Sequence, residues 1–250
     1  MSEDTPSPAK LYQVLDATWP AEALRRVGPF TLRHSPGAGK RVGSATLEAN
    51  ATDMAAHLEA TEAQMLAWDQ IPTFRCQQDA PGLDAALEAR GYEIVEPTVI
   101  YVVAPQKLVD IDRPRLSGFA HWPALAWQQE LWTQAGIGPA RQAVMDRASG
   151  AKTSILARHQ AQPCGTAFVA VHDKIAMLHA LEVHPGFRRL GNGERMLGTA
   201  AQWAQDQGCD WLSLAVTEAN ATARALYQKL GMQIAARYHY RQKRLSDGEA

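Results

Sequence analysis

The residues from Arg188 to Gly193 have the types and spacing of a phosphate-binding loop. The run reads RRLGNG and stands directly before an apolar pattern with helical period. A helix start leaves about four backbone N–H groups unpaired and carries a positive partial charge. Gly191 and Gly193 permit a tight turn, and Arg188 and Arg189 bring donors for phosphate oxygens. By itself the pattern fits a diphosphate cradle, but a solvated turn is its commoner meaning.

Composition limits the partners that such a loop can serve. The chain has 250 residues, 46% of them hydrophobic, and 25 Lys and Arg balance 26 Asp and Glu to a net charge of -1. Nonspecific nucleic-acid binding, which needs a broad basic field, is therefore not expected. Residues 1–10 are acidic and polar, and no apolar run approaches the roughly 20 residues of a membrane helix. We expect a cytoplasmic protein, monomeric or homodimeric, without membrane contact.

The cysteines and histidines do not have metal-site spacing. Cys76, Cys164 and Cys209 are odd in number and far apart, which argues against a disulfide framework or a zinc site. The eight histidines lack the helical i, i+4 pairing or cysteine partners that a metal would need. We expect three buried thiols and no metal.

Regular elements surround the loop on both sides. Three β-like segments begin at Lys152, Gly165 and Lys174, and the last two are joined by a tight turn at residues 172–174, which predicts an antiparallel meander. Upstream, helical spacing and Pro139 indicate two short helices. A helix of about four turns follows the loop and ends at Gly208.

A second strand and helix complete the pattern. Residues 211–216 alternate as a strand, and the next apolar residues have helical spacing behind Asn220, a good N-cap, with Gly231 closing the helix. The resulting order from Lys152 is β-β-β-α-β-α-β. This order is typical of an α/β (α+β) domain with a mixed, mostly antiparallel sheet flanked by helices.

Two motifs in this order resemble the GNAT superfamily of acyl-CoA-dependent N-acyltransferases. One is the strand and loop LHALEVHPGFRRLGNGERML, and the other is NATARALYQKLGM, from Asn220 to Met232. The first matches the family's [QR]xxGx[GA] loop, and the second its NxxAxxLYxxxGF-like helix, with Met232 as a conservative departure. The likeness covers roughly residues 120–244, and it implies the GNAT fold and acetyl-CoA as cofactor.

The resemblance also assigns roles to residues. The strand before the loop would carry a bulge and splay from the strand at 211–216, so that backbone groups of Leu181 and Val183 pair with pantetheine. The loop would bind the pyrophosphate through backbone N–H groups, and the second motif would supply an asparagine contact and a tyrosine acid. The coenzyme contacts implied are Leu181, Val183, Arg188, Arg189, Leu190, Gly191, Asn192, Gly193, Glu194, Asn220, Ala223 and Tyr227.

Two residues compete for the role of general base. About one alkyl amine in a thousand is neutral at pH 7, so direct attack on the thioester needs a base or a placed water. The strand parity of His179 matches Leu181 and Val183, and arylalkylamine acetyltransferases have a histidine four places before the comparable valine, which favours His179. Glu182 points the other way unless the bulge reverses it. A histidine bonded to a carbonyl and a carboxylate paired with Arg188 are the structural alternatives.

Tyr227 is the acid that the resemblance implies at the leaving sulfur. A phenol gives its proton to a thiolate uphill by about 2 kcal/mol on ordinary pKa values, so stabilisation by hydrogen bonding is the better expectation. Spacing alone would make Tyr227 a core aromatic.

The first hundred residues repeat a similar order. A hairpin, a helix from Asp53, a strand at 72–77, a helix ending near Gly91 and a strand at 92–103 give β-β-α-β-α-β without an RxxGxG loop. Leu87 would take the place of Tyr227. We expect residues 1–106 to form a smaller, degenerate and truncated GNAT-like domain, 107–116 a linker and 117–250 the catalytic domain. An unrelated α+β cap is the alternative.

The hairpin tip from Gly37 to Arg41, GAGKR, offers a second basic segment. A solvated hairpin tip is its commoner meaning, and a second anion site is the alternative.

Three functions fit these features. The first is acetyl transfer from acetyl-CoA to a small-molecule or peptide amine in a ternary complex, with the N-terminal domain lining the acceptor side. The second is transfer from another acyl-CoA, and the third is a noncatalytic coenzyme A sensor or scaffold. The sequence gives no choice among polyamine, antibiotic, amino acid and peptide acceptors, although the aromatic residues at 122, 127, 132 and 238–240 are possible pocket residues.

Overall fold

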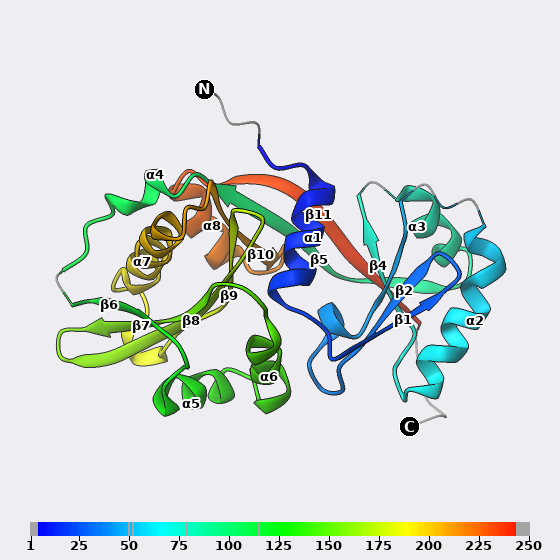
Figure 1. The fold of residues 1–250 in the computed structure, drawn as a ribbon, viewed down its shortest axis with the longest axis horizontal. Helices are drawn as coiled ribbons and strands as arrows, with labels where there is room; N and C mark the ends of the chain where they lie inside the picture. The colour runs from blue at the N-terminus through cyan, green and yellow to red at the C-terminus, as the bar shows by residue number, and fades with distance from the viewer. Residues whose placement is uncertain (1–4, 50, 52, 79, 115, 244–250) are drawn as a thin grey trace.

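One continuous sheet crosses the whole molecule. The computed structural model describes residues 5–49, 51, 53–78, 80–114 and 116–243. Eleven strands follow the order β1-β2-β3-β4-β11-β5-β10-β9-β8-β7-β6, and nearly all neighbours are antiparallel. The exceptions are β3 with β4 and β9 with β10, which run parallel. The expected mixed, mostly antiparallel sheet flanked by helices is confirmed, and Figure 1 shows it spanning both halves.

The C-terminal half contains every predicted element from Lys152 onward. The strand β6 (Gly118–His121), which the pattern did not show, precedes them. The other elements are α5 (Ala126–Gln134), α6 (Pro139–Arg147), β7 (Lys152–His159), β8 (Gln162–His172), β9 (Ile175–Val183), α7 (Asn192–Asp206), β10 (Trp211–Thr217), α8 (Ala221–Lys229) and β11 (Gln233–Lys243). Asp173 and Lys174 both have positive φ, the geometry of a tight hairpin turn of type I′.

The N-terminal half contains the expected repeat and two elements that sequence reading missed. The expected elements are β2 (Phe30–His34), β3 (Ala45–Leu47), α2 (Met54–Ala67), β4 (Thr73–Gln77), α3 (Pro81–Glu88) and β5 (Tyr92–Val103); a short 3-10 turn covers Lys40–Val42. The additional elements are α1 (Pro8–Thr18) and β1 (Ala23–Val27). Leu87 is fully buried in the core of this half, where it has a packing role.

The two halves exchange their last strands. β11 lies between β4 and β5, the last two strands of the N-terminal half, and β5 lies between β10 and β11, the last two of the C-terminal half. The short helix α4 (Gln106–Val109), which overlaps the start of the expected linker, packs on α7. The division at 107–116 therefore stays a proposal, because the sheet itself has no break there.

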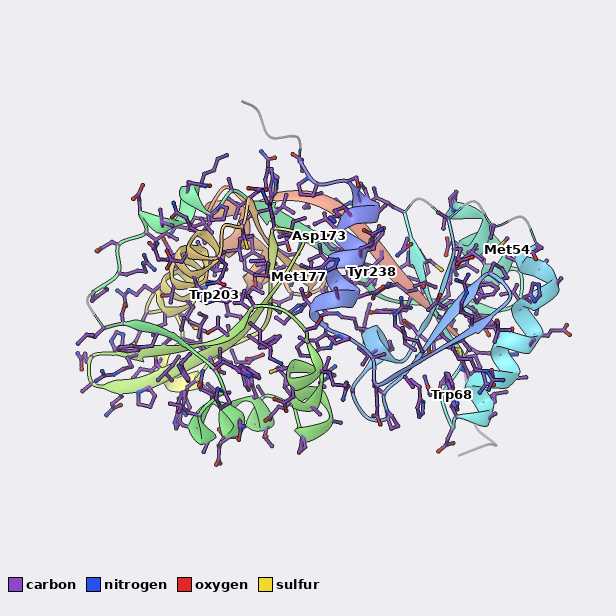
Figure 2. The ribbon with its side chains drawn as sticks, viewed as in Figure 1. Met54, Trp68, Asp173, Met177, Trp203 and Tyr238 are labelled. Carbon is purple, nitrogen blue, oxygen red and sulfur yellow. The ribbon has the colours of Figure 1, made fainter. Side chains whose placement is uncertain are left out.

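Helix α1 covers the junction of the halves. Its Leu11, Val14 and Leu15 are fully buried against β9, β11 and their neighbours. Figure 1 shows α1 crossing the middle of the sheet, with α7 and α8 toward one end and α2 and α3 toward the other. Figure 2 shows Tyr238 of β11 beside α1. Among the described residues, no helix is both long and apolar enough to span a bilayer.

Candidate active site

The basic loop ends in a left-handed glycine that starts α7. Gly191 is the N-cap, with φ 78°, and a Cβ there would meet no atom within 4 Å, so the backbone conformation alone requires glycine. The first helical bond runs from Arg195 N to Gly191 O at 3.1 Å. The backbone N–H groups of Gly191–Glu194 are thus outside the helical ladder and available to an anion. Asn192 is buried and its Nδ2 donates to Phe187 O at 2.8 Å, which folds the loop back on itself.

Strands β9 and β10 separate beside this loop. Their parallel ladder ends at the pair Leu178 and Leu214, although β9 continues to Val183 and β10 to Thr217. Beyond Leu178, the edge of β9 that faces β10 is open, and a ligand can add to it as a strand would. The predicted splay is confirmed.

A bulge at Ala180 decides which way the side chains of β9 point. Its register with β8 shifts between the pairs Phe168–His179 and Thr166–Glu182, and Ala180 has φ 51°. The indole N–H of Trp132 donates to Ala180 O at 2.8 Å and holds this conformation. The predicted bulge is confirmed.

The prediction that the His179 side chain shares a side of the sheet with Leu181 and Val183 is wrong, because the bulge inserts one residue into the alternation. Leu181 and Val183 pack with Leu178 on the α7 side of the sheet. His179 stays on the opposite side, where it packs against Trp19 and Phe168.

Tyr227 reaches the open strands from α8. Asn220 caps this helix as predicted, with its side chain accepting from Ala223 N at 3.1 Å. The Tyr227 ring is 6% exposed and lies 5.6 Å from the Tyr101 ring, centroid to centroid. Burial, with smaller contributions from the charge of Glu182 and from Tyr101, raises the pKa of Tyr227 to about 12.

A groove of about 810 Å³ joins the loop, the open strand and α8. The lining includes every predicted site residue except Leu190, which is 46% exposed, and His179. Sequence reading missed the other lining residues Phe187, Thr222, Ala225, Leu226 and Lys229. The Lys229 ammonium pairs with the Glu194 carboxylate at 2.7 Å and links α8 to the first turn of α7.

Glu182 lies in this groove with Tyr227. Its carboxyl is partly buried, and burial raises its pKa, while the nearby Arg188 opposes the rise. Arg188 itself donates from Nε to Val183 O at 3.1 Å. The groove therefore contains a carboxyl group and a phenol whose pKa values are both raised by burial.

His179 lies in a second cavity, of about 190 Å³, on the other side of the sheet. Its Nε2 is 2.9 Å from Thr18 Oγ1, and its Nδ1 is 3.1 Å from Arg41 Nη1. Because Arg41 can only donate, Nδ1 accepts; the Thr18 hydroxyl donates to Val14 O, so Nε2 carries the proton. Burial first, and then the charge of Arg41, hold the pKa of His179 well below its usual value.

One cluster outside both cavities has metal-ligand chemistry. Potential ligand atoms of Cys76, Asp84 and His239 lie within 4.8 Å of one another. Asp84 Oδ1 already bonds Arg241 Nε at 2.6 Å and His239 Nε2 at 2.7 Å, and burial raises the pKa of the Cys76 thiol to about 12. A guanidinium in contact with the carboxylate disfavours a further cation. All three cysteines are buried and free, as predicted.

Comparisons with known proteins agree with this arrangement. The sequence model of the acetyltransferase (GNAT) family matches residues 119–232. An uncharacterized N-acetyltransferase, YobR, of Bacillus subtilis is 25% identical in an alignment of 243 residues that covers 94% of this chain and 98% of that protein.

Solved structures show the same fold over nearly the whole chain. A GCN5-related N-acetyltransferase from Kribbella flavida has a TM-score of 0.76 at 21% identity, covering 96% of each chain. A tandem GNAT protein from the clavulanic acid biosynthesis pathway has a TM-score of 0.63 at 16% identity, covering 98% of this chain and 92% of its own. The likeness to a two-copy protein extends through the N-terminal half.

Proposed function

Through residues 119–232 the chain belongs to the GNAT acetyltransferase family, and from this premise we propose that it transfers an acetyl group from acetyl-CoA to a primary amine. The observation that carries the proposal is the groove itself. It leads from the unpaired amides at the start of α7, along the open edge of β9, to Tyr227 and Glu182.

The groove fits coenzyme A in size and chemistry. Its volume of about 810 Å³ is in the range of sites that enclose a large small-molecule ligand. The N–H groups at Gly191–Glu194, the helix dipole of α7 and the charges of Arg188 and Arg189 suit a pyrophosphate. The free edge at Leu181 and Val183 suits the amides of the pantetheine arm. Acetyl-CoA, when bound, supplies the activated acetyl thioester.

Tyr227 would stabilise negative charge on the leaving sulfur with a hydrogen bond. A pKa of about 12 keeps its hydroxyl protonated at neutral pH. Complete transfer of that proton to a thiolate with an ordinary pKa of about 8.5 would cost about 5 kcal/mol. The useful role of Tyr227 is therefore donation of a hydrogen bond, with the proton staying on the phenol.

Glu182 would receive the proton of the amine, directly or through one water. The raised pKa makes its carboxylate a better base than an exposed one. His179 is a weaker candidate, because its Nδ1 lone pair already accepts from Arg41 and its Nε2 proton is held by Thr18. The acyl group that we propose for transfer is acetyl.

A thiol-release assay with acetyl-CoA and a panel of amines tests this function. The expected result is amine-dependent release of coenzyme A, matched mole for mole by acetylated amine in the mass spectrum. Coenzyme binding without turnover on any amine would contradict the proposal and favour a sensor.

A further inference from the structure

We propose that the acceptor is a small primary amine that also carries a carboxylate or phosphate, and that Arg41 and Arg141 bind this anionic group in the 190 Å³ cavity. The inference rests on the proposed acetyl transfer and adds the chemical class of its acceptor.

The cavity borders the end of the coenzyme groove along β9. It reaches Ala180 and Thr217, at the place where β9 and β10 have separated, while Leu181 and Glu182 line the groove on the other side. Both halves of the chain build it. The N-terminal half supplies Trp19 and the hairpin tip from Ala38 to Arg41.

Two guanidinium groups in this cavity have no carboxylate partner among the described residues. The Lys40 ammonium and the Glu96 carboxylate, both lining residues, pair with each other at 2.7 Å. In the part of the chain that the structure describes, neither Arg41 nor Arg141 forms an ion pair with a carboxylate. A net positive charge therefore remains.

Arg41 is held in a fixed and partly desolvated position. Its guanidinium lies 5.8 Å from the centre of the Trp19 ring and donates to His179 Nδ1 at 3.1 Å. Its Nε is buried without a hydrogen-bond partner among the described residues. A partly buried guanidinium without a counter-charge is unfavourable, and an anion that supplies both acceptor atoms and charge offsets that cost.

Arg141 enters the same cavity from the C-terminal half. Its guanidinium lies against Gly39, where a Cβ would come within 2.8 Å of Nη2, and Gly39 has φ 91°. The glycine of the GAGKR tip thus makes room for Arg141 beside the backbone of the hairpin. Two arginines from separate halves converge here, and guanidinium groups bind carboxylate or phosphate through paired N–H donors.

The same charges disfavour other acceptors. A polyamine would bring further positive charge to the two guanidiniums, and Glu96, the one carboxylate among the described lining residues, is already paired. The cavity volume is also below the roughly 300 Å³ at which drug-sized ligands are enclosed. A small amine with one anionic group is the acceptor that both observations favour.

Matched acceptors test the proposal in the thiol-release assay on the full chain. The standard α-amino acids are compared with their carboxamides and their decarboxylated amines, and O-phosphoethanolamine is compared with ethanolamine. We expect kcat/KM to be at least about tenfold higher for the anionic member of the preferred set. The two arms distinguish a carboxylate from a phosphate.

Two variants test whether Arg41 and Arg141 cause the preference for an anionic acceptor. Arg41→Gln and Arg141→Gln should each raise the acceptor KM about tenfold or more and reduce the discrimination against the neutral member. The KM for acetyl-CoA should not change, which also reports that the fold is intact. Arg25→Gln, on the exposed strand β1, is the matched control and should change neither constant.

The outcomes separate the two proposals. Equal or faster transfer to the neutral members, or unchanged discrimination in both variants, would overturn the anion site while the acetyltransferase proposal stands. Turnover on no amine would contradict the acetyltransferase. In that case, calorimetry with an N-acetyl amino acid and its carboxamide tests the anion site. Selective binding of the acid that is lost in Arg141→Gln supports the site. Equal binding, or no binding, of the two compounds refutes the site.

Discussion

His179 on β9 accepts a hydrogen bond at Nδ1 from Nη1 of Arg41, at 3.1 Å, and so joins the C-terminal half to the hairpin tip of the N-terminal half. The contact fixes one neutral tautomer, since Nε2 is bonded to Thr18. The histidine thus lines the proposed acceptor cavity, and Glu182 takes the base position in the proposed mechanism.

The neutral state of His179 gives the stability of the protein a definite pH dependence. Its pKa is well below 6.5 in the folded protein, because of burial and the charge of Arg41. Below about pH 6.5 the unfolded chain therefore takes up a proton that the folded protein refuses, and the free energy of unfolding falls. In urea unfolding between about pH 7.5 and 5, His179→Gln should lose less stability than the wild type. His172→Gln, on the surface, is the control, and a wild-type slope in His179→Gln would contradict the assignment.

Removal of the Tyr227 hydroxyl should affect turnover and not affinity. Tyr227→Phe is expected to lower kcat by about 10²-fold, because the leaving sulfur loses a hydrogen-bond donor. The acetyl-CoA Kd from calorimetry should stay within about twofold. Tyr101→Phe removes a buried hydroxyl next to the same ring and should leave kcat unchanged. Equal kcat for Tyr227→Phe and the wild type would remove Tyr227 from the mechanism.

Glu182→Gln tests the proposed base. We expect kcat/KM to fall by about 10²-fold, since the amide cannot accept the proton of the amine. In the wild type, activity should decrease as the pH falls through the raised pKa of Glu182, so the acid limb should lie above the range of an ordinary carboxyl. Glu130→Gln, on the surface of α5, is the control. A larger loss in His179→Gln than in Glu182→Gln would return the role to the histidine.

Two glycines at the ends of α7 form a matched pair. Gly191 has φ 78° and Gly208 has φ 71°, and a Cβ at either would meet nothing within 4 Å. Alanine at each position should therefore cost a similar free energy of unfolding, about 1 kcal/mol, from the left-handed backbone alone. Only Gly191→Ala should also weaken acetyl-CoA binding, by about tenfold. Equal Kd values for the two variants would contradict a pyrophosphate site at this helix start.

Much of the C-terminal half could be predicted because its signals are local. The cap at Asn220, the left-handed glycines Gly208 and Gly231 after α7 and α8, and the tight turn at residues 172–174 are each specified within a few residues. The same kind of signal was present for α1 and was missed. Ser7 caps that helix ahead of Pro8, and Leu11, Val14, Leu15 and Thr18 have helical spacing.

The proposed acceptor cavity could not be predicted, because its residues come together only in the folded sheet. Trp19, Arg41, Arg141 and His179 come from separate elements, and residue pattern predicts strands without their pairing. The bulge was expected from the family resemblance, but its position was not. Ala180 adopts a positive φ that is set by the tertiary contact with Trp132.

The most direct test of the central claim is a crystal structure of the full chain with acetyl-CoA. We predict electron density for the pyrophosphate on the backbone amides at Gly191–Gly193, for the pantetheine along the free edge at Leu181 and Val183, and for the sulfur within hydrogen-bond distance of the Tyr227 hydroxyl. Density for the coenzyme in another place, or a sulfur remote from Tyr227, would contradict the account.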